Sequence, residues 1–142
     1  MSKKFLLTGI ATTLLLFLLN AVAYVAFLKN FFQSHPVISS EFMKQLYKPD
    51  SEIIWWATVL SAIAIGFLVT TVIHWSNART FLTGIRAGFV FSILLLCGVD
   101  FGLLASTNSF STASAFADII TSTTMITLSG AVAAWLLGRG KI

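Results

Sequence analysis

The chain has 142 residues, of which 57% are hydrophobic and 10% are charged, and its mean hydropathy is +0.91. A soluble domain carries about 25% charged residues, so these charges are too few to cover a water-exposed globule of this size. The composition therefore excludes a cytosolic enzyme, a disordered chain and a nucleic-acid-binding module, and it predicts one domain in a lipid bilayer. The single cysteine excludes an internal disulfide and a cysteine-based zinc site.

Four apolar stretches are each long enough to cross a bilayer as a helix, which takes about 20 residues. They cover 5–28, 53–75, 87–105 and 113–137, and none contains proline. The sequence thus predicts an all-α fold, a four-helix transmembrane bundle formed by 1–142 as a single domain. The first stretch also resembles a secretory signal peptide, since Ala21-Val22-Ala23 fits an A-x-A cleavage site. Its apolar run continues to Leu28, so we expect an uncleaved first helix.

The connection between the first two stretches is the only long one. Ser39-Ser40-Glu41 can cap a short helix over 41–47 that carries its apolar residues on one side. We therefore predict a short amphipathic segment in this outer loop. The segment 49–52, Pro-Asp-Ser-Glu, supplies a breaker, a capping residue and negative charge, which indicates the start of the second span.

The distribution of cations predicts the orientation of the bundle. If both termini are cytoplasmic, six cations lie inside and three lie outside, which the positive-inside rule favours. The inner cations are Lys3, Lys4, Arg79, Arg86, Arg139 and Lys141, and the outer ones are Lys29, Lys44 and Lys48. We expect a multi-pass protein of the bacterial cytoplasmic (inner) membrane with both termini in the cytoplasm.

Motifs for catalysis, metals and cofactors are absent from the sequence. It has no H-E-x-x-H, no G-x-S-x-G, no phosphate-binding glycine-rich loop and no C-x-x-C-H. Cys97 falls in the middle of a span, where we expect it to serve packing. We therefore expect no cofactor, no metal site and no enzymatic activity.

Two carboxylates inside the apolar stretches are candidate functional residues, because an ionisable group in the bilayer core costs several kcal/mol unless it faces a partner or water. Asp100 and Asp118 each lie about nine residues from Ser109, in the connection between the last two spans. An antiparallel hairpin would place them at the same depth, where they could bind a cation or share a proton. The structural alternative puts Asp118 in the first turn of its helix and gives Asp100 neighbouring polar partners. Asn20 and Tyr24, an i, i+4 pair, could join this polar site or link helices by hydrogen bonds.

Small residues recur at four-residue spacing and predict close helix packing. The third span has Gly84, Gly88 and Ser92, and later Gly98 and Gly102; the second has Ala62 and Gly66; the fourth has Gly130, Ala134 and Gly138. The fourth span is also rich in hydroxyls, which could bond to their own helix, line a polar crevice or form a subunit interface. These are Thr121, Ser122, Thr123, Thr124, Thr127 and Ser129.

The order of these features resembles a family of short bacterial four-helix membrane proteins described as a domain of unknown function, with relatives in Bacteroidetes-type bacteria. The resembling segments are Asn20–Tyr24 followed by Phe27–Phe32, Gly84 with Gly88, and Asp118 with Gly130. The resemblance covers most of the chain and implies the four-helix architecture, and it brings no activity with it.

Two functions remain open from the sequence. The first is a non-enzymatic membrane protein that acts by helix packing, as a homo-oligomer or as a small subunit of a larger membrane complex. The alternative is a small oligomeric transporter or channel with a cation or proton site at Asp100 and Asp118. A water-accessible cavity reaching the carboxylates would favour the second.

Overall fold

The computed structural model describes residues 2–34, 48, 50–108 and 111–139. This part of the chain is helical, and four helices are long and apolar enough to cross a membrane. The predicted all-α, four-helix fold is confirmed. The elements are α1 (Lys3–Ala23), the π-helix η1 (Tyr24–Leu28), α2 (Lys29–Ser34), the 3-10 helix η2 (Asp50–Glu52), α4 (Trp55–Trp75), α5 (Phe81–Ser106) and α6 (Thr112–Gly138).

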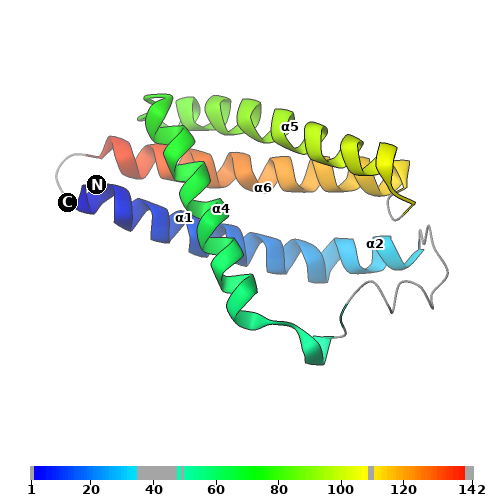
Figure 1. The fold of residues 1–142 in the computed structure, drawn as a ribbon. Coiled ribbons are helices and arrows are strands. Elements are labelled where there is room, and N and C mark those ends of the chain that lie inside the picture. Colours follow the sequence, from blue (N-terminus) through cyan, green and yellow to red (C-terminus); the bar gives the residue numbers. More distant parts are fainter. Residues whose placement is uncertain (1, 35–47, 49, 109–110, 140–142) are drawn as a thin grey trace.

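Helix α6 is the central element of the bundle. It packs against α5 along most of its length, and α1 and α4 also contact it. Helices α5 and α6 form an antiparallel pair, whereas α4 crosses α1 and α6 obliquely and its first residues lean away from the bundle (Figure 1). Both ends of the described chain lie at the same end of the bundle, which we call the terminal end (Figure 1). We call the other end, where α5 connects to α6, the hairpin end.

Hydroxyl side chains cap the first turn of three helices. The Ser2 hydroxyl accepts a hydrogen bond from the Phe5 amide at the start of α1. Thr80 and Thr83 form a reciprocal capping box at the start of α5. Ser111 accepts from the Ser114 amide at 2.9 Å and so begins α6. Such caps satisfy backbone N–H groups that the helix itself leaves unpaired.

The structure changes three of the predicted boundaries. Helix α5 begins at Phe81, six residues before the predicted position 87, because the Thr80 cap adds more than a turn. The first helix continues through η1 and α2 to Ser34 instead of ending at 28. The prediction that 49–52 caps the second span is wrong, since α4 begins at Trp55 after Ile54, which makes no side-chain cap. The predicted amphipathic segment over 41–47 lies outside the described residues.

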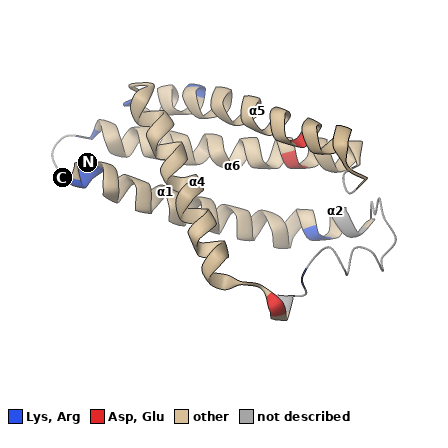
Figure 2. Cartoon of the chain, viewed as in Figure 1, with Lys and Arg blue, Asp and Glu red and all other residues tan. Residues whose placement is uncertain are grey.

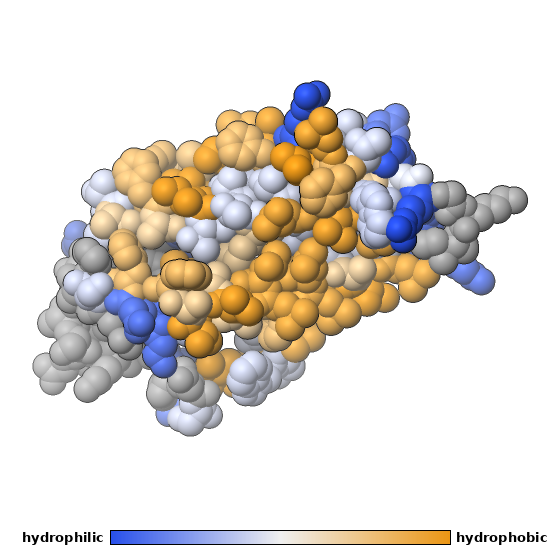
Figure 3. Space-filling view, turned by 180° about the vertical axis from the view of Figure 1, so that it is seen from behind, coloured by the Kyte–Doolittle hydropathy of each residue, from blue (hydrophilic) through white to orange (hydrophobic). Residues whose placement is uncertain are grey.

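The outer surface of the helices is apolar. Most of the face seen in Figure 3 is hydrophobic, and strongly hydrophilic residues lie toward its ends. The interior is narrow and combines small, hydroxyl and aliphatic side chains from α1, α4 and α6, including Thr12, Leu16, Val69, Ile73, Ser129 and Ala133. Apolar surface outside and a small-residue interior suit a bundle surrounded by lipid, in which tight packing holds the helices together.

Candidate functional site

The structure brings Asp100 of α5 and Asp118 of α6 together. Their carboxyl groups are close enough to interact with each other. The acidic positions of the two helices lie side by side, nearer the hairpin end than the terminal end (Figure 2). Asp100 is 3% exposed, so its carboxyl group faces the interior of the protein and not the surrounding lipid.

The two carboxyl groups have different surroundings. The Ser122 hydroxyl, one turn further along α6, donates to Asp118 Oδ1 at 3.0 Å. Asp100 Oδ2 is buried and has no hydrogen-bond partner in the described part of the chain. Asp118 lies in the second turn of α6, because the helix begins at Thr112, so the structural alternative of a first-turn carboxylate does not apply. A buried carboxyl oxygen without a partner is costly unless the group is neutral or binds a ligand.

Asn20 and Tyr24 do not join the carboxyl pair. The Asn20 amide donates to the Leu16 carbonyl of its own helix at 2.9 Å, and its side chain is exposed. Tyr24, at the start of η1, is 50% exposed. Within the described residues, no hydrogen bond links either side chain to Asp100 or Asp118.

Several of the glycines predicted to pack, Gly84, Gly88, Gly130 and Gly138, lie at close contacts with a neighbouring segment. A Cβ atom added at Gly84 would lie 2.6 Å from the Ala134 Cβ and 2.7 Å from backbone atoms of Gly130 and Ala131. One added at Gly130 would lie 3.3 Å from the Gly88 Cα. Gly138 meets the backbone of Arg79, in the connection before α5, in the same way. The terminal half of the α5–α6 interface is therefore a backbone-to-backbone contact.

Gly98 and Gly102 are different, because no atom lies within 4 Å of a Cβ added at either position. Each is two residues from Asp100, which at about 100° per residue places it on the opposite face of α5. Asp100 faces α6, so the two glycines face away from the bundle. We call this exposed surface the Gly98–Gly102 groove, because the missing side chains leave the α5 backbone open there. The sequence alone does not distinguish it from the packed stripe of Gly84 and Gly88.

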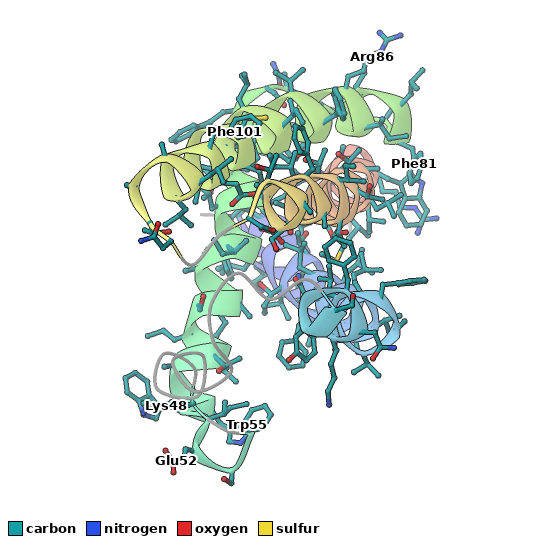
Figure 4. The ribbon with its side chains drawn as sticks, turned by 90° about the vertical axis from the view of Figure 1, so that its right-hand side faces the viewer. Lys48, Glu52, Trp55, Phe81, Arg86 and Phe101 are labelled. Atoms are coloured by element: carbon teal, nitrogen blue, oxygen red, sulfur yellow. The ribbon has the colours of Figure 1, made fainter. Side chains whose placement is uncertain are left out.

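Charged residues collect at the two ends of the bundle. At the terminal end, Lys4 Nζ donates to the Arg139 carbonyl, and the Arg139 guanidinium stacks on the Trp135 ring. Arg86 is exposed in the second turn of α5, and its side chain points away from the bundle (Figure 4). Lys48 and Glu52 precede α4 in the chain and lie at its outer end, away from the other helices (Figure 4). Apart from Asp100 and Asp118, the described residues between these ends are uncharged, which is the composition expected of a membrane interior.

A second groove, of about 380 Å³, lies between α1 and α4 and is separate from the Gly98–Gly102 groove. Its walls are apolar apart from Thr13, whose hydroxyl already donates to the Gly9 carbonyl. The lining residues are Ile10, Thr13, Leu14, Phe17, Val59, Ala62, Ile63 and Phe67. None of them belongs to α5 or α6, so the groove does not reach the carboxyl pair.

Comparison with family models, with curated proteins and with solved structures finds no match to this chain. The resemblance to short bacterial four-helix membrane proteins therefore stays a prediction. The site must be interpreted from its own geometry.

Proposed function

We propose that this chain is a non-enzymatic, multi-pass membrane protein that acts by packing its helices against a second copy of itself. The observation that supports this role is the open Gly98–Gly102 groove. The other helix glycines of the described chain meet a neighbouring element, whereas these two have free space above them. Glycines spaced by four residues let two helix backbones approach closely in a membrane.

We infer that a second copy of the chain covers this groove. Helix α5 is at the edge of the bundle, since its main contacts are with α6 and it touches α4 only lightly. A two-fold axis beside Gly98 and Gly102 would make the groove self-complementary, because each copy presents the same shallow surface. A subunit of a larger membrane complex could use the same groove, and the experiment below separates the two arrangements.

The proposed orientation places the terminal end in the cytoplasm of a bacterium, with the chain in the inner membrane. Lys3, Lys4, Arg79, Arg86 and Arg139 are all near this end. Glu52 and Lys48 are at the other end of α4 (Figure 4). This separation of charge is the pattern that the positive-inside rule describes.

The non-enzymatic part of the proposal rests on the arrangement of reactive side chains. Cys97 is on α5 in the interior of the span, and His74, at the end of α4, has Arg79 Nη2 3.5 Å from its Nδ1. These two side chains belong to different parts of the bundle, and the described residues pair neither with a second nucleophile or base. The described part of the chain therefore offers no arrangement typical of nucleophilic catalysis.

The mass of the protein in detergent tests the proposal. We expect the wild type to contain two or more copies, and Gly98→Leu and Gly102→Leu each to reduce it to one copy because leucine fills the groove. Val90→Leu adds bulk at an exposed position of the same helix and should leave the mass unchanged. A single copy in the wild type, or an unchanged mass in both glycine variants, would contradict self-association.

A further inference from the structure

A column of polar side chains runs along one face of α6 from the hairpin end to the carboxyl pair. Ser111, Ser114, Asp118 and Ser122 follow one another at spacings of three or four residues, so they share one side of the helix. The Ser111 hydroxyl donates to the Ser114 hydroxyl at 2.8 Å, and Ser122 donates to Asp118. The column leads from the cap of α6 to the partly buried Asp118 and, across the helix interface, to the buried Asp100.

The interface of α5 and α6 is too tight to admit water between the carboxyl pair and the terminal end. Between the carboxyl pair and the terminal end, α5 and α6 meet through Gly84, Gly88 and Gly130. At Gly84 the gap is too small even for a methyl group, since an added Cβ would lie 2.6 Å from α6. A water molecule needs a cavity larger than this. A path for water between α5 and α6 from the terminal end to the carboxyl pair is therefore blocked at Gly84.

The hydrogen bonds assign a role to each carboxyl group. Two ionised carboxylates in contact inside a protein repel each other, and one proton converts the repulsion into a hydrogen bond. Asp118 already accepts from Ser122, so it suits the ionised partner. Asp100 has a buried oxygen with no partner, so it suits the acid that donates to Asp118.

A metal ion fits this site less well than a proton. Calcium takes six to eight oxygen ligands, whereas this site offers two carboxyl groups and one hydroxyl that acts as a donor. Among the described residues, no group of three or more His, Cys, Asp or Glu side chains could hold a metal. One proton between the two carboxyl groups gives one donor and one acceptor, which matches the groups present at this site.

In the described part of the chain, titratable groups outside the pair do not act on the Asp100 carboxyl. The elements packed on α5 and α6 are α1, which carries Lys3 and Lys4, and α4, which carries His74, and α5 itself carries Arg86 and Cys97. Of all these and Asp118, only Asp118 acts on Asp100. The proton balance of the pair is therefore set by the burial of Asp100, by the two carboxyl groups and by Ser122.

We propose that Asp100 and Asp118 form a proton-binding pair reached from the hairpin end, in which Asp100 carries the proton and Asp118 accepts its hydrogen bond. Asp100 is buried against α6, on the far side of α5 from Gly98 and Gly102, so this proposal does not depend on self-association. A monomeric protein would retain the site.

Infrared spectroscopy of the whole protein in phosphatidylcholine vesicles tests the pair, because a protonated carboxyl group has its own C=O band. At neutral pH the wild type should show one such band, Asp100→Asn should lose it, and Asp118→Asn should keep it at a shifted frequency. Glu52→Gln, which changes an exposed carboxylate outside the spans, should leave the band unchanged. Circular dichroism should give the same helix content for all four proteins.

Three results would overturn the proposal: no protonated band in the wild type, an unchanged band in Asp100→Asn, or loss of the wild-type band when NaCl is added at constant pH. The last result would make the site a cation site. The access route has its own test, the rate of hydrogen–deuterium exchange of this band. Ser114→Ala should slow exchange several-fold, whereas Ser129→Ala, which removes a buried hydroxyl outside the column, should not. Equal rates in both variants would refute access through the column.

Discussion

Replacing Gly84 by alanine should destabilise the bundle even though it adds a single methyl group. The added Cβ would lie 2.6 to 2.7 Å from three atoms of α6, two of which are backbone atoms that cannot rotate away. Ordinary van der Waals contact begins at 3.4 Å, so α5 must move by about 0.7 Å along part of its interface. Overpacking of this kind costs about 1–3 kcal/mol, and we expect about 2–3 kcal/mol because backbone must move.

A graded series makes this prediction specific. Gly88→Ala places its Cβ 3.2 Å from the nearest atom, the Thr127 Cα, so it needs a shift of a few tenths of an ångström and should cost about 1 kcal/mol. Gly98→Ala meets nothing and should cost close to zero within one chain. Unfolding by sodium dodecyl sulfate in mixed micelles, at dilutions where the protein is monomeric, gives the free energies. For Gly84→Ala the unfolding equilibrium constant should rise roughly 30- to 140-fold, since 1.4 kcal/mol is tenfold. Equal stability of Gly84→Ala and Gly98→Ala would refute the packing argument.

Three further predictions follow from the fold. Gly130→Leu should lower the detergent melting temperature, because even a Cβ there is 3.2 Å from the Ile73 side chain, and an unchanged melting temperature would place this face outside the packed interior. Ser111→Ala should cost about 1 kcal/mol in the same assay by removing the α6 cap, and a cost near zero would show that the cap is dispensable. In a Cys97→Ser background, Ser2→Cys should be protected from a membrane-impermeant thiol reagent in intact cells while Glu52→Cys reacts; labelling of Ser2→Cys would reverse the proposed orientation.

The hydropathy of the sequence predicts the number of helices because each apolar stretch must satisfy its backbone groups internally in lipid. It predicts the helix starts less well. Hydropathy alone begins the third span after Arg86, whereas the Thr80 capping box begins α5 before it, at Phe81. A long basic side chain can remain within a span when its charged end reaches the interface. The Thr80-x-x-Thr83 pattern is the local signal for this earlier start.

The spacing around Ser109 predicts that Asp100 and Asp118 meet, because an antiparallel hairpin fixes their depth. The same reasoning does not tell which glycines are packed, since Gly84–Gly88 and Gly98–Gly102 have the same spacing. The buried residues of α5 follow a four-residue row, which turns by about 40° per step around a helix. The contact with α6 therefore moves from Gly84 to Asp100 and leaves Gly98 and Gly102 on the outer face. This rotation depends on the crossing of the two helices, which the sequence does not state.

Cysteine cross-linking in native membranes tests self-association through the groove most directly. In a Cys97→Ser background, Gly102→Cys should form a disulfide-linked dimer under mild oxidation, because two copies related by a two-fold axis bring this position close to itself. Val90→Cys, exposed on the same helix but outside the groove, should remain monomeric. Absence of the dimer for Gly102→Cys, or equal cross-linking at both positions, would contradict the proposed function.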